Sequence, residues 1–407
     1  MDAREERGLI IAATKKIRRM KDLWFVPSQN NSALYEVRIE GETQTCSCPD
    51  FEARGKKCKH IFAVEFSIQR ETSIDGSVTE TRIVRLTYSQ NWTAYNAAQT
   101  NEKARVEELL RALCDGIVQP EQKRGRPRLP LSDMVFAAAM KIYTTMSGRR
   151  ASTDIRECEE KGHIKHAPHY NSVFHYLESE ALTPVLKAMI EESASPLKAI
   201  ETDFAIDSSG FSTCAFVRWF DSKYGKMHNN RDWIKCHLMI GVKTNVVTCA
   251  EITGRDDGDA THLPLMLATT ANRFNVAEVS ADKAYISTKN LEAVTALGAV
   301  PYIPFKSNHK AEGAEVWRKM WHFYQFKREE FLMHYHKRSN IESTFAMLKA
   351  KFGPSVRSRK RTAQVNEILC KVLCHNLSVL VHSIYELGIA PTFWAETAPA
   401  QEIEVRG

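Results

Sequence analysis

Three acidic residues lie where a sheet and a helix could bring them together. Asp207 follows the apolar residues of FAID, Asp282 ends VAEVSAD, and Glu342 lies within YHKRSNIESTFAMLK. Strand ends are places where a sheet can converge acidic side chains on one site. Three carboxylates held together repel one another unless cations are present, and their hard oxygen atoms suit Mg²⁺ or Mn²⁺. A pair of such ions supports phosphodiester chemistry by activating a water or a 3′-hydroxyl and stabilising the leaving oxygen.

Each acid also has a simpler interpretation. An aspartate that ends a strand is more often a turn former. Asp203 competes with Asp207 for the first position, and we favour Asp207 because it follows the apolar positions Phe204 and Ile206. The cation-binding hypothesis therefore depends on the three acids together with the helix that carries the third.

That helix would place cations beside Glu342. Tyr335, Arg338, Glu342 and Lys349 fall within an arc of about 60° if successive residues turn by about 100°. A second stripe, about 80° away by the same arithmetic, is apolar and would pack inward: Ile341, Phe345, Leu348 and Phe352. The common explanation is a solvated charged face. The functional alternative is that Arg338 and Lys349 hold the phosphates of a strand being cut, while Tyr335 contacts its backbone or a base.

A second cluster has the spacing of a zinc site. Cys46, Cys48, Cys58 and His60 form the pattern C-x-C-x(9)-C-x-H. Three thiolates and an imidazole make a closed tetrahedral shell, which predicts one structural zinc ion. The first pair ends a predicted hairpin and the second opens the apolar helix IFAVEF, so the ion would staple a segment too small to hold a core alone. The alternative is four unrelated residues in a reducing cell.

The segment KRGRPRLP, residues 123–130, is basic and interrupted by glycine and prolines. This composition is typical of a linker. Arg124, Arg126 and Arg128 could instead lie along an A·T-rich minor groove, where arginine meets enhanced negative potential. The GRPR string resembles half of an AT-hook, and both interpretations stay open.

Composition limits the class of protein. The 407 residues suggest two or three domains, and 43% hydrophobic with 26% charged residues is ordinary for a soluble protein. The formal net charge of +7 permits a polyanionic partner. We expect no membrane span and no secretory signal, so the ten cysteines are placed in a reducing cytoplasm, where clustered thiols are more often metal ligands than disulfides.

The pattern of elements predicts an α/β fold. Residues 4–20 are expected to form a basic helix, and Ser132 is expected to cap the helix that follows the linker. After residue 200, strands come first and then alternate with helices, which indicates a mixed sheet flanked by helices. One of these strands is AFVRWF. Asn376 lies in an apolar helix that we expect to be core.

The acids and the helix face resemble a known signature. Y-x(2)-R-x(3)-E-x(6)-K is similar to that of the DDE transposases of bacterial and archaeal insertion sequences, and AIDSSGF, SADKAYIS and HKRSNIESTF resemble its surroundings. The similarity covers roughly residues 200–380, and C-x-C-x(9)-C-x-H resembles a SWIM zinc finger. The resemblance implies an RNase H-like fold in which Asp207, Asp282 and Glu342 bind magnesium. No large β-rich insertion separates Asp282 from Glu342, so a DNA-hairpin mechanism is not implied.

The resulting layout has five parts. They are a SWIM-type region at 1–90 with its zinc module at 34–66, a connecting segment at 91–130, a helical DNA-binding or dimerisation region at 131–195, an RNase H-like catalytic domain at 196–387, and a loose tail at 388–407.

The resemblance implies a transposase that binds the terminal inverted repeats of its element, cleaves there and joins the 3′-hydroxyls to target DNA. Its expected partners are double-stranded DNA and further copies of itself, in a homodimer or larger complex near the nucleoid, with no membrane partner. Two rivals stay open. One is a DNA-binding regulator descended from a transposase, which would need no third carboxylate, and the other is a related nuclease that does not join strands.

Lesser candidates surround the three acids. Lys283 and Tyr285 are possible DNA contacts, although a solvated lysine and a packing tyrosine explain them equally well. Lys306 and His309 are possible phosphate contacts, and residues 355–361, SVRSRKR, could follow flanking DNA or form a plain basic loop.

Overall fold

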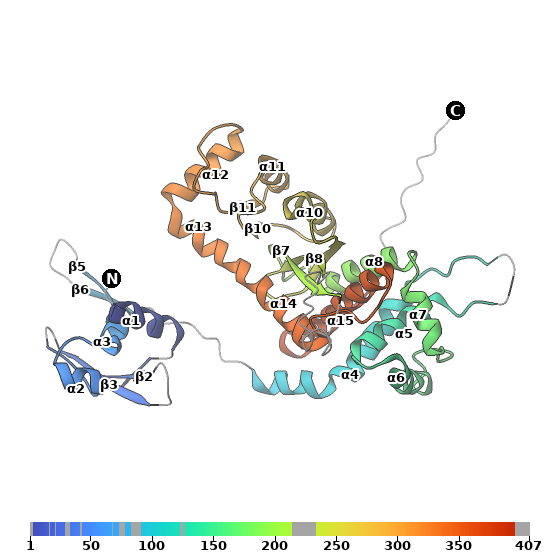
Figure 1. Ribbon diagram of the computed structural model, residues 1–407, viewed down its shortest axis with the longest axis horizontal. Helices are drawn as coiled ribbons and strands as arrows, with labels where there is room; N and C mark the ends of the chain where they lie inside the picture. Colours follow the sequence, from blue (N-terminus) through green and yellow to red (C-terminus); the bar gives the residue numbers. More distant parts are fainter. Residues whose placement is uncertain are drawn as a thin grey trace, which may run out of the picture. The chain divides into compact units, whose positions relative to one another are not determined.

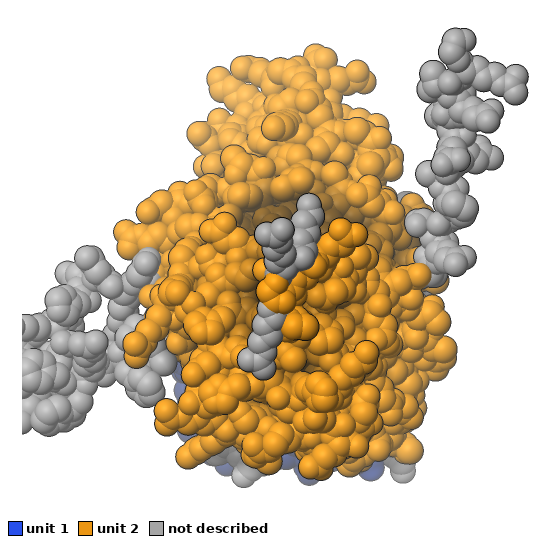
Figure 2. Space-filling model, turned by 90° about the vertical axis from the view of Figure 1, so that its right-hand side faces the viewer, with its two compact units in different colours: residues 1–90 blue, residues 91–407 orange. Residues whose placement is uncertain are grey.

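The computed structural model divides the chain into two compact units, Met1–Gln90 and Asn91–Gly407, which Figure 2 shows in different colours. Each unit has its own hydrophobic core. The structure describes residues 3–15, 17–20, 22–28, 33–40, 43–66, 68–72, 78–82, 91–122, 125, 127–213 and 233–394.

The first unit packs a helix pair on an antiparallel sheet of order β1-β2-β3-β4, and a separate hairpin joins β5 to β6. Helix α3 contacts the sheet, and α1 packs on α3. The elements are α1 (Ala3–Thr14), β1 (Arg18–Met20), β2 (Leu23–Pro27), β3 (Leu34–Glu40), β4 (Thr43–Cys46), α2 (Pro49–Arg54), α3 (Lys59–Phe66), β5 (Ile68–Thr72) and β6 (Val78–Arg82).

Alternating side chains give this unit its core. Val37 is fully buried, and Tyr35 and Ile39 pack against the same cluster from the same face of β3. The predicted β3–β4 hairpin is therefore confirmed, with Val37 paired to Cys46. Helix α1 crosses α3 closely at Gly8, where a Cβ would lie only 2.5 Å from the Cβ of Phe62.

The helix predicted for residues 4–20 was too long. Helix α1 ends at Thr14, and Arg18–Met20 form strand β1, paired with β2. Pairing with a neighbouring strand has overridden the local helical pattern, which a single segment cannot reveal.

The second unit contains a five-stranded mixed sheet of order β11-β10-β7-β8-β9. Strand β7 is antiparallel to β8 and parallel to β10, β8 is antiparallel to β9, and β10 is parallel to β11. The strands are β7 (Asp203–Ser212), β8 (Trp233–Gly241), β9 (Val247–Thr253), β10 (Glu278–Ala281) and β11 (Val300–Tyr302). This confirms the predicted mixed sheet, although the strand expected at AFVRWF lies outside the described residues.

Helices surround this sheet (Figure 1). Helix α10 contacts β8 and β9, α8 and α15 contact β9, and α14 contacts β7. The helices before the sheet are α4 (Trp92–Cys114), α5 (Leu131–Tyr143), α6 (Gly148–Glu160), α7 (Tyr170–Leu177) and α8 (Leu182–Ala194). Those after β9 are α10 (Leu263–Ala271), α11 (Thr288–Ala296), α12 (Glu315–Phe326), α13 (Arg328–Tyr335), the 3₁₀ turn η3 (His336–Arg338), α14 (Ser339–Phe352) and α15 (Arg361–Leu387).

The helices of residues 131–195 share the core of the sheet unit and do not stand apart from it. Helix α15 packs against α4, α5, α7 and α8, so the first helices of this unit are joined to its last one. Ser132 does not cap α5, because the helix already begins at Leu131 after Pro130. The sequence predicted the helices correctly but not their fusion with the sheet.

Helix α15 is the central support of this unit. It is long and apolar enough to cross a membrane, but 83% of its apolar window is buried inside the protein. Asn376 is fully buried on it, as expected for a core residue. Its amide Nδ2 donates to the carbonyl of Val247 (2.7 Å) and to Ser193 Oγ (2.9 Å), and its Oδ1 accepts the Val247 N–H (2.8 Å). One side chain thus ties α15 to α8 and β9.

The first residues of the tail predicted from residue 388 are not loose. Ile389, Phe393 and Trp394 pack against the core. The Trp394 backbone N–H donates to Glu192 at 2.6 Å, and its indole N–H donates to the Leu113 carbonyl at 2.8 Å. Residues 395–407 lie outside the described part of the chain.

Candidate active site and metal centre

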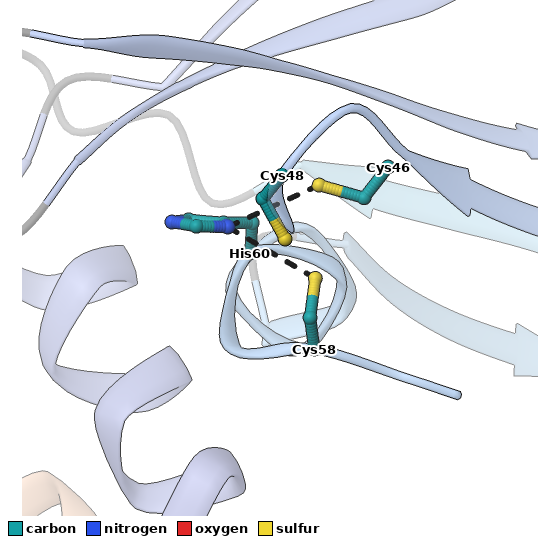
Figure 3. A group of neighbouring side chains, drawn as sticks. All are labelled: Cys46, Cys48, Cys58 and His60. Atoms are coloured by element: carbon teal, nitrogen blue, oxygen red, sulfur yellow. Dashed lines mark hydrogen bonds between the residues drawn. The ribbon is translucent and has the colours of Figure 1, made fainter. Parts of the chain in front are cut away.

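The predicted zinc ligands meet between β4 and α3 (Figure 3). Cys46 ends β4, Cys48 is the N-cap of α2, Cys58 directly precedes α3, and His60 lies in its first turn. All four side chains are buried, and their ligand atoms lie within 4.8 Å of one another. Nδ1 of His60 lies 3.9 Å from the sulfur of Cys46 and 3.9 Å from that of Cys58. Three sulfurs and one imidazole nitrogen at this spacing fit a closed, structural zinc site.

The electrostatics of this cluster favour a cation. The Cys46 thiol is hydrogen-bonded to Cys58 and lowers the pKa of Cys58 to about 4, and the same interaction raises the pKa of Cys46. Burial raises the pKa of Cys48. The group therefore stabilises one thiolate at the expense of the others, and a divalent cation would stabilise all three because thiolates are its ligands.

Two of the predicted catalytic acids are brought together by strand register. Ile206 on β7 pairs with Ala281, the last residue of β10, so Asp207 and Asp282 follow on neighbouring strands. Strand β7 does not end at Asp207, as predicted, but continues to Ser212 along its antiparallel partner β8. Asp207 instead lies beside the carboxyl end of the parallel strand β10. It is therefore next to Asp282, which follows that strand.

Arg338 connects the third acid to the first. Its guanidinium donates through Nη1 to Asp207 and through Nη2 to Glu342 Oε1, the latter at 2.7 Å. The Asp207 side chain is 21% exposed and that of Glu342 is 62% exposed. Positive charge is therefore already held between two carboxylates, which are the hard oxygen donors that Mg²⁺ or Mn²⁺ prefers. The chemistry of these residues fits a hard divalent cation.

The pKa of Asp207 is raised above its ordinary value. Burial is the main cause, and the charges of Asp282 and Asp259 add to it, against the lowering effects of the Ser208 N–H and Arg338. Asp282 itself accepts the N–H of Ala284 at 2.7 Å through Oδ1, so its carboxylate is oriented by the turn that follows β10. These acids repel one another, as expected of carboxylates gathered for a cation.

The signature helix is not continuous. Tyr335 ends α13, residues 336–338 form the 3₁₀ turn η3, and Glu342 lies in the first turn of α14. A 3₁₀ turn rotates successive residues by about 120°, so the single 60° arc drawn for these residues does not hold. Contact between Arg338 and Glu342 survives because they remain four residues apart.

Lys349 reaches the same strand as Asp207 from the far end of α14. Its Nζ donates to Ser209 Oγ at 2.6 Å and lies 5.3 Å from the centre of the Phe211 ring. Asp207, Ser209 and Phe211 alternate along one face of β7, so Lys349 and the first acid face the same side of the sheet. Burial lowers the pKa of Lys349.

The competitor Asp203 has a different partner. Lys337 donates to its Oδ2 at 2.7 Å and to Glu278 at 2.8 Å, which clamps β7 and β10 to η3. The carboxylate of Asp203 is thereby engaged away from Arg338. This contact supports the choice of Asp207 over Asp203.

Two family models match the chain. Residues 198–377 match the transposase DDE domain, and residues 35–69 match the SWIM zinc finger. The chain carries a transposase DDE domain. A SWIM zinc finger precedes it, and a comparison with curated proteins finds no similar sequence. The match implies that the five-stranded sheet has the RNase H-like fold and that the DDE domain uses a divalent metal to act on nucleic acid.

The DDE domain contains an acid that sequence reasoning missed. Asp259 Oδ1 accepts hydrogen bonds from Ser208 Oγ at 3.1 Å and from Lys235 Nζ at 3.0 Å. It acts electrostatically on Asp207 and on Tyr285. The run GRDDGDATH was the available signal, but several acids in a loop gave no reason to prefer one. Tyr285 is fully buried beside these acids, so it packs in the core.

The basic linker is only partly described. Arg124 and Arg126 lie outside the described residues, whereas Arg128 is exposed and its backbone N–H donates to Gln122 Oε1 at 3.0 Å. Its role in DNA binding therefore stays a prediction. Among the lesser candidates, His309 packs its ring 5.1 Å from that of Trp317, while Lys306 is exposed.

Proposed function

We propose that this protein is a DNA transposase that binds the terminal inverted repeats of an insertion sequence, cleaves at the ends and joins the 3′-hydroxyls to target DNA. The proposal is carried by Arg338, which links Asp207 to Glu342 inside a DDE domain. A DNA-binding regulator would need neither a third carboxylate nor a cation held between two acids. The partners would be double-stranded DNA and a second copy of the chain or more, at the nucleoid.

The residues divide the work by their positions. Asp207, Asp282 and Glu342 would hold Mg²⁺ or Mn²⁺, which when bound stabilises the attacking and leaving oxygens of phosphodiester chemistry. Arg338 would exchange its carboxylate partners for a phosphate of the scissile strand. Lys349 would hold a second phosphate from the same face of β7.

The bonds follow from this class of reaction. In cleavage, a water oxygen bonds to phosphorus, the bond to the 3′-oxygen breaks, and a 3′-hydroxyl is released. In joining, that hydroxyl loses its proton and attacks a target phosphate, and the target's own 3′-oxygen leaves as a hydroxyl. Both steps are displacements at phosphorus and need no oxidant or nucleotide energy source.

The zinc finger would stabilise the first unit and add a surface for DNA or protein. No ligand position of Cys46, Cys48, Cys58 and His60 is left for a substrate, so this site would take no part in the chemistry. Arg124, Arg126 and Arg128, in the segment between α4 and α5, would add phosphate contacts.

The test first searches the DNA on both sides of the gene for short inverted repeats and then uses a labelled duplex that carries them. Wild-type protein with Mg²⁺ should nick the end and transfer it to a plasmid, whereas Glu342→Gln should bind the duplex in a gel shift and do neither. Wild-type cleavage without joining would select the nuclease alternative. Binding without cleavage by the wild type would select the regulator.

A further inference from the structure

A cavity of about 380 Å³ lies away from the acids of the DDE site. Helices α5, α6 and α7 form one side of it, and residues 357–363 form the other. Its size lies within the range of pockets that hold small ligands, roughly 300–1,000 Å³. None of its lining residues belongs to the carboxylate site, so a ligand bound in the cavity would not contact the three acids.

Lys141 on α5 places an ammonium group in this cavity. The residue is only 6% exposed, and among the described residues its Nζ has no hydrogen-bond or ion-pair partner. Glu367 and Arg357 act on it from a greater distance, and burial lowers its pKa. An ammonium group on a largely buried side chain is poorly solvated, and an anion bound in the cavity would offset that cost.

The N-terminus of α6 opens into the same space. Ser147 and Gly148 line the cavity, and no side chain caps the first turn of this 13-residue helix. Backbone N–H groups at a helix N-terminus bind anions, phosphate in particular. The Lys141 ammonium and the helix terminus therefore favour the same kind of ligand.

The opposite wall is basic and held in place. Glu367, 2% exposed, accepts the backbone N–H of Ser358 at 2.8 Å and that of Arg357 at 2.9 Å. This fixes the loop that carries the exposed Arg359 into the lining. Glu178 is the one acid of the lining, and it is ion-paired with Lys360 at 2.6 Å.

An aromatic ring lies beside these cations. Phe174 is 37% exposed and lines the cavity, and the Lys141 Nζ is 5.9 Å from its ring centre. The Phe174 ring can lie against the N-terminus of α6 because residue 148 is glycine. A Cβ at Gly148 would lie 2.4 Å from Phe174 Cζ. An exposed ring next to a phosphate-binding position is the arrangement that receives an unstacked base.

We propose that this cavity holds one nucleotide of a DNA strand, with its phosphate between Lys141 and the N-terminus of α6 and its base against Phe174. The proposal rests on the proposed function in one respect, that DNA is the substrate. It gives the helices before the DDE domain a defined part in holding that DNA.

The experiment uses the full chain and a short single-stranded oligothymidylate with one central 5-iododeoxyuridine. Irradiation should cross-link the probe to the peptide containing Phe174, as read by mass spectrometry. Phe174→Leu should abolish that cross-link and weaken binding about tenfold, as expected for the loss of one stacked base. Lys141→Met should lower the salt slope of binding by about 0.7, which corresponds to one phosphate on a single strand.

Matched controls separate the cavity from general surface effects. Phe326→Leu, at a ring 78% exposed on α12, and Lys319→Met, at an exposed lysine on the same helix, should leave the cross-link and affinity unchanged. Deoxyadenosine monophosphate should compete better than inorganic phosphate. Equal competition, a cross-link that persists in Phe174→Leu, or equal losses in the controls would each overturn the proposal.

The outcome is distinguishable from that of the proposed function. Glu342→Gln should retain the cross-link, because the acid site and the cavity share no residue. If the wild-type chain forms the cross-link but does not cut DNA, the nucleotide-binding proposal stands and the proposed transposase function is wrong. If the wild-type chain cuts and joins DNA but Phe174→Leu and Lys141→Met change neither the cross-link nor the affinity, only the nucleotide-binding proposal is wrong.

Discussion

The two predicted metal-binding regions of this protein differ in how far their ligands are already gathered. The four zinc ligands are buried, converge within 4.8 Å and form the one such group in the described part of the chain. The three acids of the DDE domain are more exposed, and a guanidinium joins two of them. A structural ion needs a closed site, whereas a catalytic one needs access for substrate. The buried cluster is therefore suited to hold its ion permanently, whereas the more exposed acids are suited to bind an ion together with a substrate.

The largest effect should follow from Asp207→Asn. Cleavage and joining should fall by several orders of magnitude, because a proposed ligand of the two-metal site would lose its charge. Stability should not fall. The folded state raises the pKa of Asp207, so the ionised carboxylate costs stability above that pKa, and this cost disappears as the pH falls through it.

The measurements are strand transfer on the labelled end and a thermal melt at neutral pH. Asp207→Asn should melt at or slightly above the wild-type temperature. A variant that cuts at the wild-type rate would remove Asp207 from the site, and Asp203→Asn should then be tested in its place.

Cys48→Ser should disrupt the zinc site of the first unit. Zinc content should fall from about one ion per chain to well below it, and amide exchange should rise across the first unit, because the ion staples β4 to α3. The DDE domain should keep its own protection. Cys158→Ser, at a buried cysteine outside the cluster, is the matched control and should retain zinc. Active wild-type protein without zinc would contradict the prediction.

Arg338→Gln should sharpen the comparison by changing metal affinity upward. Removing the guanidinium from between Asp207 and Glu342 leaves a more negative site, so Mn²⁺ affinity without DNA should rise on the order of tenfold. Cleavage should nevertheless fall, because the proposed guanidinium contact with the scissile phosphate would be lost. Titration calorimetry measures the affinity. Lys337→Gln removes a neighbouring cation that pairs with Asp203, and it should leave Mn²⁺ affinity unchanged. Equal gains in both variants would mean that only net charge matters.

The smallest effect concerns the linker. Replacing Arg124, Arg126 and Arg128 by alanine should flatten the salt dependence of duplex binding by roughly 0.9 for each phosphate that is no longer neutralised. Lysine at the same positions should restore the slope, because charge rather than shape sets it. Binding measured by anisotropy across a salt series gives the answer, and an unchanged slope in the alanine variant would make the segment a tether only.

Local patterns predicted what local sequence determines. The zinc ligands span few residues, so their spacing alone placed them correctly, and the β3–β4 hairpin followed from alternation. Asp207 and Asp282 could be proposed from strand ends, but their adjacency depends on the β7–β10 register. The sequence could not show that Asp203 pairs with Lys337 whereas Asp207 pairs with Arg338, because both contacts depend on the tertiary fold.

Features that depend on distant partners were missed for the same reason. Asp259 lies in a turn after β9, and its position depends on hydrogen bonds from Ser208 on β7 and Lys235 on β8. The end of the chain looked loose, yet Trp394 bonds to Glu192 and Leu113, more than two hundred residues earlier in the sequence. The 3₁₀ turn between α13 and α14 interrupts a pattern that reads as one helix.

Asn376 has a consequence for aggregation. Strand β9 is the outermost strand on its side of the described sheet, and such an edge offers free backbone groups to any other extended chain. The Asn376 amide binds both the N–H and the carbonyl of Val247, as a neighbouring strand would. A buried side chain of a helix thus blocks the edge from within, and α15 covers it. Two copies of this chain that meet at high concentration would in this way be kept from joining their sheets at β9.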